Sequence, residues 1–249
     1  MSYYKFRPIS KFLNESLTIS SIYFSKPGAL NDPFDCRLNN GALFGNKLFS
    51  SDSRLASVKK NFENNDYFET PSTQPGFSDH GIFSVSKLSI TNKEEGHETL
   101  MWSHYADEHK GVRLKYNLDQ HILNAQPPAF TIDTDVFYDD ENFLNFMINL
   151  EETGKNFHDE FCYRYLTIKH PAWKYEQEVR FVRPLFGPVT INPACLEEIC
   201  FGLNTSEDDK KRIIKLAYTH CGCTNFKKKV RGPGWLDFTD EQIFYTDYR

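Results

Sequence analysis

The stretch WKYEQEVRF, from Trp173 to Phe181, alternates at period two and predicts a β-strand. One face of this strand would carry Glu176, Glu178 and Arg180. The opposite face would carry Tyr175, Gln177, Val179 and Phe181. Residues two apart on a strand are separated by about 6.6 Å, and two ionised carboxylates at that distance repel by roughly 2.5 kcal/mol at an effective dielectric constant of about 20. We therefore expect the acidic face either to point into bulk water or to meet a cation.

Strands outnumber helices in the rest of the chain and do not alternate regularly with them. We expect strands at residues 2–7, 22–25, 81–89, 111–116, 130–138 and 223–230. We expect helices at residues 10–17, 50–65, 93–109, 140–167 and 206–218. Ser10 and Ser206 are suited to cap the first and the last of these helices, whereas residues 195–202 suit either a helical turn or a strand. This pattern is typical of a single α+β domain over residues 1–249, built on curved, mainly antiparallel sheets.

The composition is that of a globular chain without an excess of positive charge. Of its 249 residues, 39% are apolar and 15% aromatic, and the formal net charge is −5. These values argue against disorder and against a globally basic nucleic-acid binder. The first ten residues lack the pattern of a signal peptide, and no apolar run is long enough for a membrane span. We expect a cytoplasmic protein without a membrane segment.

Several common catalytic and metal-binding motifs are missing. The sequence has no G-x-x-x-x-G-K-[ST], G-x-G-x-x-G, H-E-x-x-H or G-x-S-x-G, which argues against the usual routes of ATP-dependent phosphoryl transfer, dinucleotide redox chemistry, zinc proteolysis and serine hydrolysis. The six cysteines are expected to be free thiols in a reducing compartment. The spacings around Cys221 and Cys223 match structural zinc sites poorly, so we expect no metal.

Two clusters of candidate site residues lie on expected strands. Tyr3, Lys5 and Arg7 share one face of the first strand, where a cation could grip a phosphate or a carboxylate. A solvated terminal strand would show the same pattern. Ser84 and Ser86 share one face of another strand, where paired hydroxyls could bind a sugar or orient a carboxylate. Exposed serines on a half-buried sheet are the plainer interpretation.

Two further clusters lie on a loop and near a helix end. The loop Asn31-Asp32-Pro33-Phe34-Asp35 could line a ligand, although Asn and Asp also tie their own backbone into turns. The segment MWSHYADEHKG, residues 101–111, gathers Trp102, His104, Tyr105 and His109. These side chains could stack on a ring or transfer a proton, but buried His and Tyr often only satisfy hydrogen bonds.

The order of these clusters suggests a reaction. An arginine strand, then a serine strand, then a Glu-x-Glu strand is the arrangement needed to bind NAD and to cleave its nicotinamide–ribose bond. That cleavage passes through a positively charged, oxocarbenium-like sugar, which an ionised glutamate would stabilise. The arginine would hold the pyrophosphate, and a serine would hold the glutamate or the ribose.

The chain resembles a large bacterial family of domains of unknown function. The resemblance covers about residues 3–220 and is carried by YKFRPI, SIYFSKPGALNDPFDC, GIFSVS, LMWSHYADEHKGVRLKY, WKYEQEVRF and EICFGLNTSEDDKKRI. A more distant resemblance links Arg7, Ser84 or Ser86, and Glu178 to the ADP-ribosyltransferase superfamily of the Arg–Ser–Glu type. It implies a split, curved β-sandwich with flanking helices and an NAD cleft between the sheets. The chain departs from that pattern because its serine strand lacks the usual Ser-Thr-Ser triplet.

The leading hypothesis is an NAD-dependent mono-ADP-ribosyltransferase, a bacterial toxin or anti-phage effector that modifies RNA, DNA or protein. An antitoxin partner would fit such a role, and a hydrolase that only cleaves NAD is a close relative. The expected catalytic residues are Glu178, Glu176 and His104. The expected NAD-binding residues are Tyr4, Lys5, Arg7, Asn31, Asp32, Phe34, Ser84, Ser86, Trp102 and Tyr105.

Two other classes of function remain open from the sequence. A non-catalytic nucleic-acid-binding module would use the basic run Phe226–Arg231 with nearby Trp235 for base stacking. A metal-dependent nuclease would use His104 and His109 with Asp107 and Glu108. A run of lysines is more often a solvated face, and no recognisable Asp/Glu–Lys metal motif supports the nuclease.

Overall fold

The computed structural model describes residues 2–32, 35–36, 53–64, 77–87, 97–118, 134–135, 140–153, 160–161, 164–234 and 238–248. The chain divides into two compact units, each assembled from segments far apart in the sequence. Unit 1 comprises Met1–Tyr23, Ser84–Ala129 and Pro188–Arg249. Unit 2 comprises Phe24–Phe83 and Phe130–Gly187.

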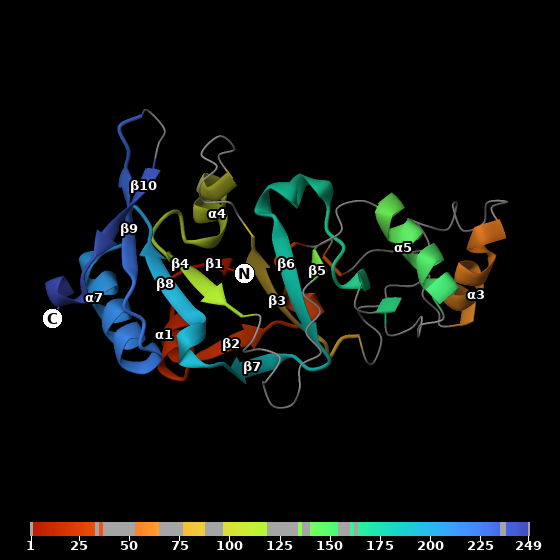
Figure 1. The fold of residues 1–249 in the computed structure, drawn as a ribbon, viewed down its shortest axis with the longest axis horizontal. Coiled ribbons are helices and arrows are strands. Elements are labelled where there is room, and N and C mark those ends of the chain that lie inside the picture. Colours follow the sequence, from red (N-terminus) through yellow and green to blue (C-terminus); the bar gives the residue numbers. More distant parts are fainter. Residues whose placement is uncertain are drawn as a thin grey trace. The chain divides into compact units, whose positions relative to one another are not determined.

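Unit 1 is built on a mostly antiparallel sheet with the strand order β10-β9-β8-β4-β1-β3 (Figure 1). The strands are β1 (Ser2–Arg7), β3 (Gly81–Ser86, of which Ser84–Ser86 belong to this unit), β4 (Val112–Asn117), β8 (Leu196–Phe201), β9 (Phe226–Arg231) and β10 (Phe238–Ile243). Only the β8–β9 pair is parallel among the registers that are defined, and α7 (Glu207–Leu216) makes its crossover. The short strands β2 (Ser21–Phe24) and β7 (Gly187–Thr190) form a separate two-stranded sheet, largely in this unit.

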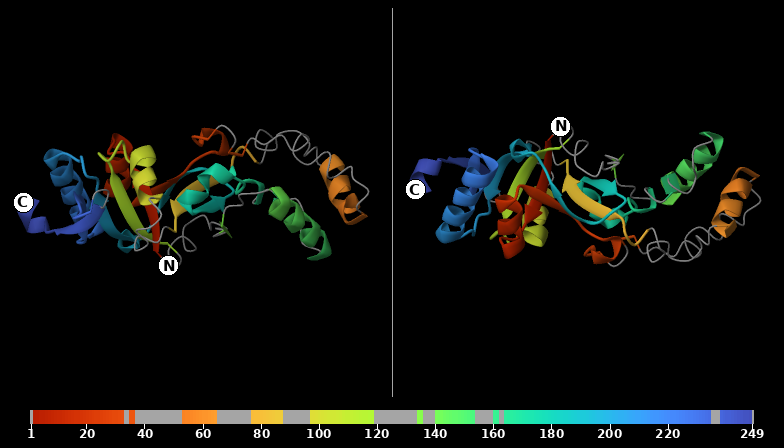
Figure 2. Two further views of the ribbon diagram at one scale, coloured as in Figure 1. Left: turned by 90° about the horizontal axis from the view of Figure 1, so that it is seen from above. Right: turned by 90° about the horizontal axis from the view of Figure 1, so that it is seen from below.

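The helices of unit 1 start where the sequence offers a cap. In α1 (Lys11–Thr18), the Ser10 hydroxyl accepts a hydrogen bond from the Leu13 N–H, and in α7 the Ser206 hydroxyl accepts one from Asp209. Both contacts satisfy backbone donors that a helix start leaves open. The two helices contact each other (Figures 1 and 2). Their buried side chains are Leu13, Leu17, Ile213 and Ile214, together with the partly aliphatic Lys210.

Unit 2 packs helices and irregular segments around an aromatic core. Its strand order is β3-β6-β5, with Gly81–Phe83 of β3, β6 (Glu178–Arg183) and β5 (Thr134–Asp135). Its helices α3 (Ala56–Asn64) and α5 (Asp140–Thr153) lie beside each other (Figures 1 and 2). The ring of Phe161 lies 5.3 Å from Phe62 and 6.3 Å from Phe77, both edge-on. Phenylalanine rings therefore supply much of the core volume of unit 2.

The expected α+β fold with a mostly antiparallel sheet is confirmed, but the opening stretch is not one continuous strand. Residues Pro171–Glu176 form a 3₁₀ helix, η5, and β6 begins only at Glu178. Proline suits the first turn of such a helix, and the His170 ring accepts a hydrogen bond from the Ala172 N–H. Gln177 then adopts a left-handed conformation, with φ 45°. Glu176 and Glu178 therefore stand on two different elements.

None of the helices in the described residues has the length and apolar character needed to cross a membrane.

Candidate functional site

The acidic pair Glu176 and Glu178 lies in a buried ion-pair cluster of unit 2. We call it the unit 2 cluster, and its members are Asp35, Lys169, Glu176, Glu178 and Arg180. The Lys169 ammonium contacts Glu176 Oε2 at 2.6 Å and Glu178 Oε2 at 2.7 Å. The Arg180 guanidinium donates from Nε to Glu178 Oε1 at 2.8 Å and from Nη2 to Asp35 Oδ2 at 2.9 Å. The carboxylate pair therefore meets cations and not bulk water.

Burial makes these contacts stronger than surface ion pairs. The side chains of Glu178 and Arg180 are 5% and 0% exposed, respectively. Burial alone would raise the pKa of Glu178, but Arg180 and Lys169 hold it well below its usual range. Burial also raises the pKa of Asp35, although Arg180 opposes that change. Two carboxylates on one guanidinium thus have pKa values displaced in opposite directions, a feature found at sites of acid–base chemistry and also in structural networks.

Asp35 has an unusual position within the unit 2 cluster. It is 2% exposed, and its Oδ2 binds Arg180, whereas its Oδ1 has no hydrogen-bond partner within the part of the chain that the structure describes. The next residue, Cys36, adopts φ 55° and places its Sγ 3.8 Å from Arg180 Nη1. Arg180 Nη1 also donates to the Leu166 carbonyl at 2.8 Å. The NDPFD loop and the EVRF strand are therefore joined by one buried arginine.

The expected arginine and serine strands are neighbours in unit 1. Tyr4 of β1 is opposite Ser86 of β3 in an antiparallel pair. Lys5 Nζ donates to the Ser84 carbonyl at 2.6 Å. Ser86 is buried, whereas Ser84 and Arg7 are partly exposed. The ring of Tyr4 lies 5.4 Å from the guanidinium carbon of Arg113.

Three expected residues lie on α4 (His97–Tyr105), but in different surroundings. Trp102 is buried, donates from Nε1 to Glu98 at 3.1 Å, and packs edge-on against Phe6. His104 is exposed and Tyr105 is partly exposed, with their rings 6.3 Å apart. Trp102 thus serves the packing of unit 1.

The loop before Asp35 is described only in part. Asn31 is exposed and Asp32 is 4% exposed. Phe34, another expected NAD-binding residue, lies outside the described residues, as does Trp235 of the proposed nucleic-acid surface.

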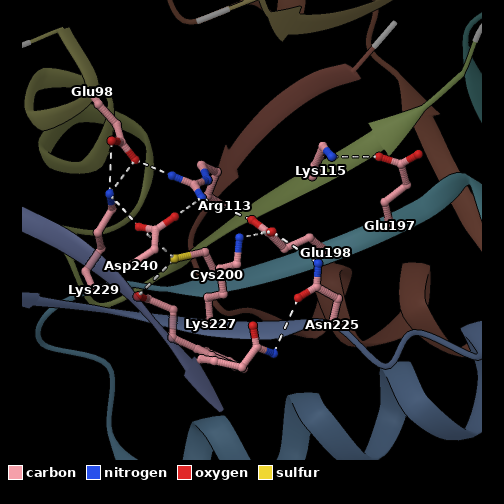
Figure 3. A network of polar contacts seen from close by, with 12 residues as sticks. Glu98, Arg113, Lys115, Glu197, Glu198, Cys200, Asn225, Lys227, Lys229 and Asp240 are labelled. Atoms are coloured by element: carbon pink, nitrogen blue, oxygen red, sulfur yellow. Dashed lines mark hydrogen bonds and ion pairs between the residues drawn. The ribbon is translucent and has the colours of Figure 1, made fainter. Parts of the chain in front are cut away.

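A second buried network lies in unit 1 (Figure 3), and we call it the unit 1 network. Its members are Glu98, Arg113, Glu198, Lys227, Lys229 and Asp240. The side chain of Arg113 is 1% exposed and contacts all three carboxylates, with Nη2 at 3.1 Å from Glu198 and 2.7 Å from Asp240. Lys229 contacts Asp240 at 2.7 Å and Glu98 at 3.0 Å. Three carboxylates and three cations make this set of side chains neutral.

This network involves most of the basic run on β9. Lys227 contacts Glu198 at 2.6 Å, and Lys228 contacts Glu241 at 2.8 Å. With Lys229 also paired, each of the three lysines has a carboxylate partner within unit 1. Such lysines are poorly placed to neutralise phosphates without losing these contacts, so the run gives little support to a nucleic-acid surface.

The nuclease motif forms a turn instead of a metal centre. Asp107, Glu108 and His109 all adopt left-handed backbone conformations, with φ between 47° and 69°. Asn204 holds this turn by donating to the His109 carbonyl at 2.9 Å. Gly202 is required beside it, because a Cβ there would stand 2.1 Å from the His109 carbonyl oxygen. Within the described parts of the chain, no group of three or more His, Cys, Asp and Glu side chains could hold a metal ion.

His109 belongs to the packing of the same region. Its ring stacks on Trp102 at 6.2 Å, and its Nε2 lies 3.3 Å from Ser103 Oγ. Burial lowers the pKa of His109, although Glu98 opposes that change.

The chain is an α+β protein in which each of the two units contains a cluster of charged side chains, largely buried. Residues 101–181 match the family described as "Protein of unknown function (DUF2971)", which confirms the expected resemblance to a domain-of-unknown-function family. The match includes the turn after α4 and the first part of β6, up to Phe181, with Glu178 and Arg180 of the unit 2 cluster. No curated protein and no solved structure matches the chain.

The sequence pattern placed Arg180 on one face with Glu176 and Glu178, but it did not identify Lys169 and Asp35 as members of the same cluster. Lys169 precedes the η5 segment and carries no motif of its own. Asp35 and Arg180 do lie inside the motifs NDPFD and EQEVRF. An arginine that follows two glutamates was the available signal, since a buried acidic pair needs a cation.

Proposed function

We propose that the chain is an NAD-dependent mono-ADP-ribosyltransferase with Glu178 as its catalytic carboxylate and NAD as its substrate. The single observation that carries the proposal is that Glu178 is buried yet held in its ionised form by Arg180 and Lys169. An ionised carboxylate beside the ribose is what cleavage of the nicotinamide–ribose bond needs. The nicotinamide leaves with the bonding electrons, and the positive charge remains on the ribose.

The charge balance of the unit 2 cluster is favourable for that transition state. Its five members provide three carboxylates against two cations, all nearly excluded from water. In such a low-dielectric setting, fixed charges act more strongly on a developing positive charge than they would in water. Glu176 shares Lys169 with Glu178 and adds to the negative potential there.

The Arg–Ser–Glu type has an arginine strand beside a serine strand, and each unit is compared with that type by itself. In unit 1, the arginine strand β1 is the neighbour of β3, which carries Ser84 and Ser86. In unit 2, the first half of β3 is followed in the sheet by β6, which begins with Glu178. We assign the binding of NAD to Arg7 with Tyr4, Lys5 and one of the two serines.

The acceptor is proposed by resemblance. RNA, DNA or protein would receive the ADP-ribose, as in toxins and anti-phage effectors of the superfamily. The five buried free cysteines among the described residues suit a reducing compartment, so we place the reaction in the cytoplasm.

The test is transfer from labelled NAD. The purified chain is incubated with NAD labelled in its adenylate phosphate and with RNA, DNA, a protein extract or buffer alone. We expect label on one acceptor class together with released nicotinamide, and loss of both with Glu178→Gln. Free ADP-ribose without an acceptor would identify the related hydrolase. Undiminished transfer by Glu178→Gln would remove Glu178 from the mechanism, and no turnover of NAD by the folded wild type would remove the proposed function.

A further inference from the structure

Asp35 is a second carboxylate on the guanidinium that holds Glu178. Arg180 uses Nε on Glu178 Oε1 and Nη2 on Asp35 Oδ2, so its planar fork spans the two acids. The two aspartate oxygens differ, because Oδ2 is paired with Arg180 and Oδ1 is buried with no hydrogen-bond partner among the described residues. Asp35 and Glu178 therefore share one buried guanidinium.

We propose that Asp35 is a positioning residue that acts through Arg180 to fix the orientation of the Glu178 carboxylate. This inference rests on the proposed function for its catalytic consequence, but the coupling of the two carboxylates can be measured without NAD. Asp35 occupies one end of Arg180 while the Leu166 carbonyl accepts from Nη1, so the guanidinium has little freedom to rotate away from Glu178.

The same geometry links the state of Asp35 to that of Glu178. Among the described residues, the charged groups around Asp35 are Arg180 and Glu178 on β6 and Lys169. The neighbouring thiol of Cys36 is neutral there, because burial raises its pKa to about 12. Burial raises the pKa of Asp35, and Arg180 works against it. When Asp35 takes up a proton, Arg180 loses one of its two charged partners and holds Glu178 less rigidly.

The experiment compares Asp35→Asn with a matched variant, Asp240→Asn. Asp240 also pairs with a buried arginine, at 2.7 Å from Arg113, but it belongs to unit 1. Each substitution removes one charge beside an arginine and keeps the shape of the side chain. The rate of NAD turnover is normalised to the folded fraction, and kcat and KM are measured from pH 7 downward.

We expect Asp35→Asn to lower kcat on the order of 10- to 100-fold with little change in KM, because the loss is one of orientation. The wild-type kcat should fall as Asp35 becomes protonated, and this acid limb should be missing in Asp35→Asn. Asp240→Asn should keep both the wild-type kcat and the acid limb. An active Asp35→Asn enzyme with wild-type kcat and pH profile would overturn the inference.

The second readout is the carboxyl ¹³C resonance of Glu178. We expect it to shift as Asp35 titrates in the wild type and to lose that shift in Asp35→Asn. If the folded wild type does not turn over NAD, the proposed function fails, and this titration still decides the coupling. A Glu178 resonance that is unaffected by Asp35→Asn would overturn the inference in that case as well.

Discussion

The Arg180 guanidinium turns back along β6 onto Glu178, two residues earlier on the strand, and its Nε donates to Oε1 at 2.8 Å. Side chains two apart on a strand lie on the same face, so the contact follows directly from the pleat. Lys169 completes the neutralisation of Glu178 from outside the strand, at 2.7 Å. This relationship explains why two glutamates and an arginine stand so close together in the sequence.

Removing Arg180 should destabilise the protein strongly. Arg180→Met would leave Glu178 and Asp35 buried with one cation fewer, which typically costs about 3–5 kcal/mol of unfolding free energy. Urea denaturation measures this loss. Arg212→Met is the control, since Arg212 pairs with Asp209 at the surface, where the side chain is 48% exposed, and such pairs contribute less than about 1 kcal/mol. Equal losses in the two variants would contradict the assignment of Arg180 as a buried ion-pair centre.

The stability of the protein should also depend on Lys169 at alkaline pH. Burial alone would lower the pKa of Lys169, but Glu178 and Glu176 raise it above its usual value. A raised lysine pKa contributes stability that is fully present below the unfolded-state pKa of about 10.4 and is lost as pH rises through the folded pKa.

The measurement compares the wild type with Lys169→Met by urea denaturation at several values from pH 8 upward. The wild type should be more stable near pH 8, and its advantage should narrow above pH 10.4, roughly the ordinary lysine value. Other titrating groups are shared by the two proteins and cancel in the difference. A gap that stays constant to the highest pH at which the wild type folds would show that the charge of Lys169 contributes nothing.

The turn after α4 should be intolerant of a side chain at Gly202. A Cβ at Gly202 would stand 2.1 Å from the His109 carbonyl oxygen, which belongs to the backbone and cannot rotate away. We expect Gly202→Ala to cost about 1–3 kcal/mol or more, as overpacking does. Gly28→Ala is the control because nothing lies within 4 Å of its Cβ. Thermal unfolding should separate the two variants, and a Gly202→Ala protein as stable as Gly28→Ala would contradict the described packing.

Two neighbouring lysines on β9 should differ in their effect on stability. The side chain of Lys229 is 4% exposed and contacts Asp240 and Glu98, whereas that of Lys228 is 33% exposed. Lys229→Met should cost about 1.5–3 kcal/mol, because it removes two charge-assisted contacts while Arg113 still pairs with both carboxylates. Lys228→Met should cost less than about 1 kcal/mol. Chemical denaturation of both variants checks this. If the two substitutions lowered the free energy of unfolding by the same small amount, the unit 1 network would not be the stabilising element described here.

Local patterns in the sequence predicted much of the fold. The strand at residues 2–7, the helix after Ser10 and the helix after Ser206 are all found where the alternation and the capping serines place them. The prediction of a strand over residues 173–177 was wrong. Tyr175 and Gln177 alternate with Glu176 and Glu178 as residues of a strand would, but residues Pro171–Glu176 form a 3₁₀ helix. Pro171 and the left-handed Gln177 decide the local structure instead. A non-glycine residue in a left-handed conformation leaves no signal in residue type, and the same applies to Asp107, Glu108 and His109.

The sequence predicts only the part of the candidate site that lies in one short segment. Glu176 and Glu178 are two positions apart in the sequence, so their shared need for a cation can be predicted. Asp35 is separated from Arg180 by 145 positions, and the pairing depends on how unit 2 folds. The lysine run on β9 shows the converse, since its carboxylate partners come from α4, β8 and β10. The sequence alone does not show that these three lysines are paired, because their carboxylate partners are distant in the chain and are brought near only by folding.

The most direct test of the central claim is the rate of nicotinamide release by Glu178→Gln and Glu198→Gln, normalised to the folded fraction. The two glutamates are matched, since both side chains are 5% exposed and each pairs with one arginine and one lysine. We expect Glu178→Gln to slow release roughly 100- to 1,000-fold, as loss of a key electrostatic group does, and Glu198→Gln to release nicotinamide at the wild-type rate. Equal rates in the two variants would contradict the claim that Glu178 stabilises the transition state.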